Sequence, residues 1–250
     1  MQAFISDLHG NQEALNSVLE HMEGLGVSRV FCLGDIIGYG PNPCECLDRA
    51  QSFDYCLKGN HEASLVDYAG DFNPQARKAL NWTRDSILGA CPTQAAEKER
   101  WEWLNNLPEA AYEFQFMCVH GSPRDPLREY VMPQDIYNSH KMIDLFANME
   151  RSICFVGHSH VPGIYTEDMN YYPQKDLENG FIPGEGKVLV NIGSVGQPRD
   201  GDRRACYVTW DGKRLRFHRV EYDFRITMDK ILQTHGKLPD MLAFRLEEGR

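Results

Sequence analysis

Five short segments of the sequence carry aspartate, asparagine and histidine residues of the types that bind metal ions. They are 7–11 (Asp-Leu-His-Gly-Asn), 34–35 (Gly-Asp), 59–62 (Gly-Asn-His-Glu), 120–121 (His-Gly) and 157–160 (Gly-His-Ser-His). Five of the nine histidines of the chain fall in these segments, so the clustering is unlike a chance distribution. Carboxylate, amide and imidazole groups without a thiolate suit Mn, Fe, Zn or Ni better than a thiolate zinc site or a calcium cage.

Spacing within two of the segments adds a second argument for a shared site. Asp7 and His9 are two residues apart, as are His158 and His160. Side chains two apart on an extended segment project to the same side, so each pair is expected to bind at one site together. Other segments supply the remaining candidate ligands, Asp35, Asn60 and His120.

The elements that would position these residues alternate between strands and helices at the start of the chain. Apolar runs predict strands at 3–6, 29–33 and 53–57, with helices between them at about 15–22 and 43–50. This order indicates an α/β fold with parallel pairing at its start. The polar segments follow the carboxyl ends of the strands, the edge at which open α/β sheets bind ligands.

The rest of the chain reads as a helical insert followed by more strands. Helical spacing dominates about 62–110, and we interpret this stretch as an insert with Trp82, Trp101 and Trp103 in its core. We expect no further domain boundary, so residues 1–250 form a single domain. After the insert, strands are predicted at 112–119 and 152–156, a helix at 134–147, and loops at 121–133 and 167–186. Three hairpin-connected antiparallel strands are predicted at 187–191, 205–210 and 214–222, with a turn at Asp211-Gly212. Two helices are expected at the end.

Composition and charge limit the partners that this chain can have. Hydrophobic residues make up 42% of the sequence, so the chain should fold. The net charge is −10, so the chain should not attract nucleic acids or anionic membranes strongly. A site for a phosphate group would therefore need a local positive charge such as a bound cation. The eight cysteines show no Cys-x-x-Cys pair and no leader precedes the first motif, which together favour free thiols and a cytoplasmic protein.

Taken in order, the five segments resemble the motifs of the calcineurin-like metallophosphoesterases. Segment 191–199 (Asn-Ile-Gly-Ser-Val-Gly-Gln-Pro-Arg) also resembles the bacterial small phosphodiesterase branch of that superfamily. The resemblance implies two stacked mixed β-sheets flanked by helices, an αββα sandwich, and two divalent metal ions. It implies Asp7, His9 and His160 on one metal, Asn60, His120 and His158 on the other, Asp35 as the bridge and His61 as a catalytic imidazole that binds neither.

Two departures from the serine/threonine phosphatases of the superfamily bear on the substrate. Gly38 stands where those enzymes have an aspartate that orients the catalytic histidine, and Lys58 stands where an arginine often holds phosphate. Protein phosphatase activity is therefore not the favoured function. Arg124 is the predicted substrate-binding residue because its loop follows His120 directly, and Arg128 and Arg199 are the other arginines that could contact a phosphate group.

These residues together predict an enzyme. Two cations that share one carboxylate, manganese among the candidates, would lower the pKa of a water molecule for in-line attack, with His61 protonating the leaving group or stabilising charge. We expect a metal-dependent phosphoesterase acting on small phosphodiesters or nucleotides. Hydrolysis of dinucleoside polyphosphates or phosphomonoesters is the alternative enzyme activity. A nuclease would need a basic groove, which a net charge of −10 disfavours. A non-catalytic scaffold is disfavoured because all eight motif residues are present. The oligomeric state stays open.

Overall fold

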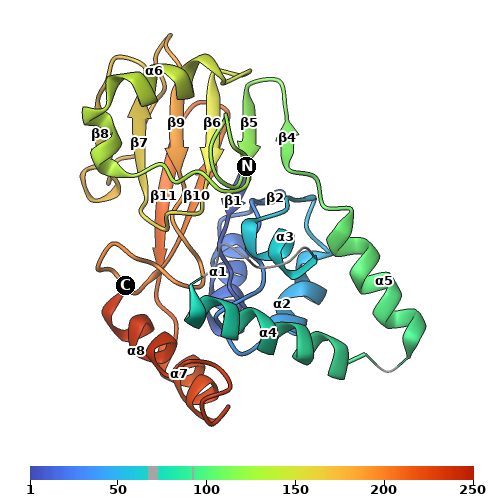
Figure 1. The fold of residues 1–250 in the computed structure, drawn as a ribbon. Helices are drawn as coiled ribbons and strands as arrows, with labels where there is room; N and C mark the ends of the chain where they lie inside the picture. The colour runs from blue at the N-terminus through green and yellow to red at the C-terminus, as the bar shows by residue number, and fades with distance from the viewer. Residues whose placement is uncertain (67–72, 92) are drawn as a thin grey trace.

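The computed structural model describes residues 1–66, 73–91 and 93–250. Residues 67–72 and 92, which fall within the predicted helical insert, lie outside the described residues. Two β-sheets form the centre of the molecule (Figure 1). The first has the strand order β11-β10-β1-β2-β3. Its strands are β1 (Gln2–Ile5), β2 (Arg29–Cys32), β3 (Tyr55–Cys56), β10 (Ala205–Trp210) and β11 (Leu215–Val220).

Parallel and antiparallel pairing both occur in each sheet. In the first sheet β1, β2 and β3 run parallel, whereas β10 and β11 add as antiparallel strands. In the second sheet, ordered β4-β5-β6-β9-β7-β8, the strands β5, β6 and β9 run parallel. Its strands are β4 (Ala110–Tyr112), β5 (Phe116–Val119), β6 (Ile153–Val156), β7 (Gly163–Thr166), β8 (Tyr171–Pro173) and β9 (Val188–Asn191).

The two sheets pack face to face through an aromatic core. The Phe4 ring of the first sheet stacks on the Phe155 ring of the second at a centroid distance of 3.7 Å, and Phe116 packs edge-on against Phe4. Helices α1 (Gln12–Gly24) and α2 (Pro43–Ala50) bury their apolar faces on the outer side of the first sheet. Helix α6 (Ser139–Ala147) covers the outer side of the second. The predicted four-layer αββα arrangement is thus confirmed.

Local sequence explains where helix α1 begins and which of its faces packs against the sheet. Asn11 precedes α1, and its side chain accepts a hydrogen bond from the N–H of Ala14, which satisfies one of the unpaired donors of the first turn. The residues of α1 that are buried recur every three or four positions, so a single stripe faces the sheet. The remaining helices of the described residues are α3 (Asn60–Val66), α4 (Pro74–Gly89), α5 (Gln94–Asn105), α7 (Phe224–Leu232) and α8 (Met241–Glu248), with short 3-10 turns at Pro133–Tyr137 and Gln174–Asp176.

The helices near the predicted insert divide between two apolar clusters. Trp101 and Trp103 of α5 pack against the core beneath α1 and α2. Trp82 of α4 instead packs against the C-terminal helices α7 and α8, which the sequence had not linked to this region. In Figure 1, α4 and α5 lie on one side of the first sheet while α7 and α8 lie below it.

Three strand predictions were wrong. Residues 112–119 do not form one strand, because the chain turns at 113–115, where Phe114 is 94% exposed, and separates β4 from β5. Strand β9 does not belong to the C-terminal hairpin; it enters the second sheet parallel to β6. The region 162–173 holds the antiparallel pair β7 and β8, part of which was expected to be loop. The turn at Asp211-Gly212 between β10 and β11 is confirmed, with Gly212 at φ 93°.

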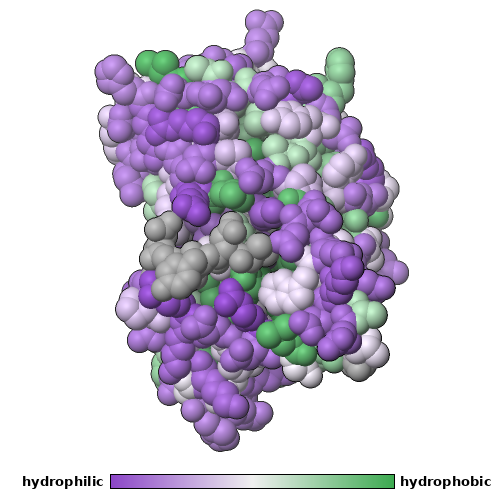
Figure 2. All heavy atoms as spheres, turned by 45° about the vertical axis from the view of Figure 1, so that its right-hand side comes forward, coloured by the Kyte–Doolittle hydropathy of each residue, from purple (hydrophilic) through white to green (hydrophobic). Residues whose placement is uncertain are grey.

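The surface and the thiols agree with the composition. On the face drawn in Figure 2, hydrophilic residues predominate and hydrophobic ones form separate small groups. In the described part of the chain, none of the helices has the length and apolar character needed to cross a membrane. All eight cysteines are described and all are free thiols, as the spacing predicted.

Candidate metal centre and active site

All seven predicted metal ligands meet at one edge of the two sheets. Asp7 follows β1, Asp35 follows β2, His120 follows β5, and the pair His158 and His160 follows β6. His9 lies in the loop between β1 and α1, and Asn60 is the first residue of α3. Because parallel strands end at the same edge, residues distant in sequence reach one place. Six of these seven residues are buried and Asn60 is partly exposed. Their role as ligands stays a prediction.

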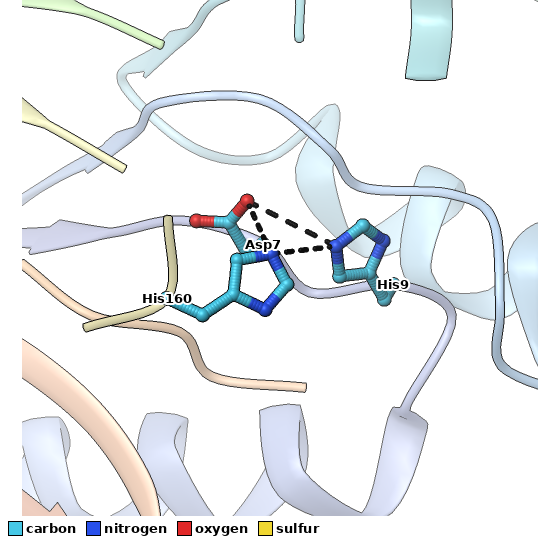
Figure 3. Close-up of side chains that lie close together, drawn as sticks. All are labelled: Asp7, His9 and His160. Carbon is cyan, nitrogen blue, oxygen red and sulfur yellow. Dashed lines mark hydrogen bonds and ion pairs between the residues drawn. The ribbon is translucent and has the colours of Figure 1, made fainter. Parts of the chain in front are cut away.

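One group of possible ligands consists of Asp7, His9 and His160. Figure 3 shows the three side chains pointing toward one another. The His160 Nε2 atom lies 3.2 Å from Asp7 Oδ1 and 3.2 Å from His9 Nε2. Asp7 Oδ1 is buried and has no hydrogen-bond partner among the described residues. Three donor atoms therefore face a common point that a cation could occupy.

A second group consists of Asp35, His120 and His158, with Asn60 beside it. The His120 Nε2 atom lies 3.4 Å from Asp35 Oδ2, 3.1 Å from His158 Nδ1 and 3.0 Å from Asn60 Oδ1. Asp35 Oδ2 is also 3.7 Å from His9 Nε2, which belongs to the first group. The Asp35 carboxylate thus lies between the two groups, as a bridging ligand would.

His61 forms a third possible group with His9 and Asp35. Its Nε2 atom lies 3.9 Å from Asp35 Oδ2, the longest of the histidine distances to this carboxylate. Geometry alone leaves a ligand role open for His61 beside the catalytic role that we predict.

Each of the four candidate imidazole ligands uses its second ring nitrogen on a backbone carbonyl. His9 Nδ1 bonds Ile37 O, His120 Nδ1 bonds Leu33 O, His158 Nε2 bonds Arg128 O and His160 Nδ1 bonds Gln197 O. A carbonyl can only accept, so the hydrogen-bonded nitrogen carries the proton in a neutral ring. The nitrogen that faces the site then presents a lone pair, the arrangement that metal-binding histidines adopt.

Electrostatics in the metal-free protein favours the same reading. Burial lowers the pKa of His9, His158 and His160, so these rings are neutral. Burial would also lower the pKa of His120, but the Asp35 carboxylate outweighs it and raises this pKa to about 9. A proton on His120 thus supplies part of the positive charge that a cation would bring to this carboxylate.

The backbone of the site is strained at the ligand positions. Asp7, His9, Asp35, His158 and His160 all have positive φ values, between 47° and 64°. Non-glycine residues rarely adopt this region, and such strain concentrates at functional sites. Tertiary hydrogen bonds hold the conformation, including those of the Asp7 N–H with Gly34 O and of the His9 N–H with Asp35 O.

The spacing argument from extended segments was only half right. Asp7 and His9 do join the same group, although neither is extended. His158 and His160 separate, His158 into the group with His120 and His160 into the group with Asp7. All four residues have left-handed backbone, so the rule for extended segments applies to neither pair.

Glu62 is a residue of the site whose role sequence reasoning missed. Its buried carboxylate accepts hydrogen bonds from the backbone N–H groups of Asp35, Ile36, Ile37 and Gly59, three of them at 2.8 Å. It therefore holds the loop after β2 against the start of α3. Burial, with the nearby Asp35 charge, raises the pKa of Glu62 to about 7, while the N–H donors act in the opposite direction. Its place in the Gly-Asn-His-Glu segment was the available signal.

Glycines allow the loops around His61 to approach closely. A Cβ on Gly38 would lie 2.0 Å from His61 Nδ1, and a Cβ on Gly59 would lie 2.2 Å from Asp35 Oδ1. Gly38 thus contributes to the placement of His61 by allowing the ring to lie against its backbone. The backbone N–H of His61 also donates to Asp35 Oδ1 at 2.9 Å, which fixes the His61 backbone beside the carboxylate that lies between the two groups.

A cavity of about 210 Å³ opens over the two groups. Its wall includes the ligand candidates His9, Asp35, Asn60, His158 and His160 and the predicted catalytic residue His61. The lining also has two tyrosines, two arginines and two smaller polar residues: Tyr39, Tyr130, Arg128, Arg199, Ser64 and Asn73. Tyr130 stacks on the His158 ring at a centroid distance of 3.8 Å, a contact for which the sequence gives no signal.

Arg124, the predicted substrate-binding residue, is not part of the described cavity lining, and its role stays a prediction. Its guanidinium bonds Glu129 through Nε at 2.7 Å and Asp144 through Nη1 at 2.6 Å, and its Nη2 bonds Glu129 as well. Two acidic neighbours thus hold its donors outside the cavity, whose described lining has Arg128 and Arg199 instead.

Segment 191–199 forms hydrogen bonds with the backbone of two ligand segments. The Ser194 hydroxyl donates to Asp7 O, the Gly196 N–H donates to Asp7 O, and the Asn191 amide donates to Gly157 O. These bonds connect the first and fifth ligand segments, those that carry Asp7 and His158. The segment therefore positions ligands on both sheets.

Comparisons with known proteins decide the family. A family model described as the calcineurin-like phosphoesterase superfamily domain matches residues 1–214. The chain belongs to this superfamily. It is 35% identical to an uncharacterized protein of Methanocaldococcus jannaschii, over 100% of this chain and 98% of that protein.

Solved structures of full-length similarity agree with this membership. A metallophosphoesterase from Sphaerobacter thermophilus is 34% identical, with a TM-score of 0.82 over 100% of this chain and 98% of that one. A hypothetical protein from Pyrococcus horikoshii shares the fold at 21% identity, with a TM-score of 0.75 over 100% and 99% of the two chains. The calcineurin-like phosphoesterase fold thus extends over the whole chain, and membership indicates a hydrolase of phosphoesters.

Within this calcineurin-like phosphoesterase, Lys58 does not face the cavity as a phosphate-binding residue. Its Nζ atom donates to Asn105 O at the end of α5, at 2.9 Å, and its N–H donates to Pro108 O. Positive charge for a substrate must therefore come from other residues of the lining or from bound cations.

Proposed function

We propose that the chain is a metal-dependent phosphoesterase that hydrolyses small phosphodiesters or nucleotides at a centre of two divalent cations. One observation carries the proposal. Two pairs of imidazole nitrogens face each other, His9 with His160 at 3.2 Å and His120 with His158 at 3.1 Å. Backbone carbonyls hold protons on the opposite nitrogens of all four rings, so lone pairs meet in the His9–His160 pair unless positive charge lies between them. In the His120–His158 pair, a second proton on His120 supplies the positive charge that a cation would bring.

The donor set fits Mn, Fe, Zn or Ni. Asp7, His9 and His160 would hold one ion, Asn60, His120 and His158 the other, and Asp35 would contact both. When bound, two such ions supply Lewis acidity for a water nucleophile and positive charge for phosphoryl oxygens. The chain contributes the loops and the buried carboxylates that set this charge in place.

His61 is the residue that we assign to proton transfer. It is buried on the cavity wall, and burial lowers its pKa to about 4 in the protein alone. The negative charge of a bound phosphate group acts to raise the pKa of an adjacent imidazole, against the effect of burial and of bound cations. When it carries a proton, the ring can protonate the leaving oxygen or stabilise charge on the transferring group.

A metal analysis combined with a substrate panel tests the proposal. Purified protein should bind two equivalents of Mn or Ni per chain, and its activity should disappear with a chelator and return with metal. The panel would compare bis(p-nitrophenyl) phosphate, p-nitrophenyl phosphate, a nucleoside monophosphate and a dinucleoside polyphosphate. Binding of two metals without turnover of any phosphate ester would contradict a catalytic function.

A further inference from the structure

Arg199 is placed against the candidate metal centre by the same loop that orients a ligand. The loop follows β9, and its Gln197 carbonyl accepts the Nδ1 proton of His160. The backbone N–H of Arg199 then donates to the His160 carbonyl at 3.3 Å. The Arg199 side chain lines the cavity together with His61 and Asp35.

The guanidinium of Arg199 is fixed by neutral groups. Its Nη2 and Nε atoms donate to Gln197 Oε1 at 2.8 and 3.3 Å, and its carbon lies 5.8 Å from the centre of the Tyr39 ring. The side chains of Tyr39 and Tyr130 line the same cavity. The contacts with Gln197 and Tyr39 limit the rotamers of the side chain, so its position in the cavity is prepared before any ligand binds.

Among residues 1–66, 73–91 and 93–250, the arginine nevertheless has no carboxylate partner. Arg124, Arg204 and Arg219 each pair with an aspartate or glutamate. None of the ion pairs found among the described residues involves Arg199. A half-buried guanidinium in a protein with net charge −10 would be expected to find a carboxylate unless its place is shaped for another anion.

The loop that carries Arg199 is itself anchored. Asp200, the next residue, pairs with Arg219, whose side chain is only 5% exposed. Arg219 Nε also bonds Gln174 Oε1 at 3.1 Å. Because the anchor lies on β11 and the neighbouring turn, the position of Arg199 depends on elements outside the ligand loops.

We propose that Arg199 binds the additional non-bridging oxygen of a phosphomonoester and so directs this site toward terminal phosphate groups, including those of nucleotides. The inference rests on the proposed function and selects among its substrate classes. A monoester at neutral pH has three non-bridging oxygens and nearly two negative charges, whereas a diester has two such oxygens and one charge. A guanidinium fork matches phosphate oxygens in pairs, which makes it a suitable partner for the extra oxygen.

Two substrates with the same leaving group test the assignment. Metal-loaded wild type, Arg199→Gln, Arg199→Lys and the control Arg204→Gln would be compared on p-nitrophenyl phosphate and bis(p-nitrophenyl) phosphate. Arg204 lies in the same loop but pairs with Asp202 at 2.6 Å. Arg199→Gln should lower kcat/KM for the monoester by about 10- to 100-fold and for the diester by less than about threefold. Arg199→Lys should fall between, because it keeps the charge without the fork.

Binding of inorganic phosphate gives a second readout that needs no turnover. Calorimetric titration should show phosphate affinity reduced at least about tenfold in Arg199→Gln, with metal content equal to wild type. Equal losses on both esters, unchanged phosphate affinity, or loss of metal from the variant would overturn the assignment. If wild type hydrolyses neither ester, the proposed function fails, whereas the phosphate titration still decides whether Arg199 binds phosphate.

Discussion

Substitution of Glu62 by glutamine tests how the loop after β2 is held. One carboxylate oxygen accepts the N–H groups of Asp35 and Gly59, and the other accepts those of Ile36 and Ile37. Whichever way a glutamine amide is oriented, its NH₂ group faces two N–H donors, and both donors lose their partner. A buried donor without a partner costs about 1–3 kcal/mol, so we expect a loss of about 2–6 kcal/mol in the free energy of unfolding.

The same change should weaken metal binding through Asp35. Its N–H is one of the four donors, so the carboxylate between the two ligand groups shifts when the loop relaxes. Loss of such a supporting hydrogen bond typically lowers metal affinity by about 10- to 100-fold. Urea unfolding of metal-free protein and titration with Mn would measure the two effects, with Glu99→Gln on the exposed side of α5 as the control.

The result that would refute this reasoning is specific. A glutamine resembles a protonated glutamate, and burial favours the protonated form of Glu62. If Glu62→Gln unfolds at the same urea concentration as wild type and binds metal equally well, the native residue is protonated. The four N–H groups would then not depend on a carboxylate.

Three further outcomes follow from the geometry. Asp35→Asn should remove most activity and weaken binding of both metals, because this carboxylate lies between the two groups; two retained metals with normal turnover would exclude the bridge. His61→Gln should keep both metals while lowering kcat by about 10² to 10⁴, more for an alkyl than for a p-nitrophenyl leaving group, whereas loss of a metal would make His61 a ligand. Burial, with nearby His21 and Arg216, lowers the pKa of His218 from 6.5 to about 4. As pH falls, the unfolded chain binds a proton at this residue before the folded chain does, so His218 should contribute stability above pH 6.5 that is lost as pH falls toward 4. His218→Gln should therefore reduce the difference between the urea midpoints at about pH 7.5 and about pH 5. An unchanged difference would exclude this contribution.

Much of the centre could be predicted without coordinates because its parts are local. Each ligand segment follows a short apolar run, and a parallel strand delivers whatever follows it to one edge of a sheet. The choice of Asp, Asn and His over Cys restricts the metals by donor chemistry alone. The order of the five segments was enough to identify the superfamily and, with it, the stacked sheets.

Long-range contacts decided the rest. Whether residues 188–191 join the hairpin or the second sheet depends on which neighbour offers a free edge, and periodicity says nothing of that. The division of His158 and His160 between two groups depends on which side chains meet each ring, His120 for His158 and Asp7 with His9 for His160.

The contrast between Arg124 and Arg199 has the same physical origin. Both are arginines in loops near ligand segments, and sequence proximity to His120 favoured Arg124. Folding brings Glu129 and Asp144 to Arg124, whereas Arg199 is left with Gln197 and the Tyr39 ring. The sequence by itself determined the donor set and the superfamily; the tertiary structure decided which positive charge faces the cavity, because a guanidinium already neutralised by carboxylates has little affinity left for a phosphate.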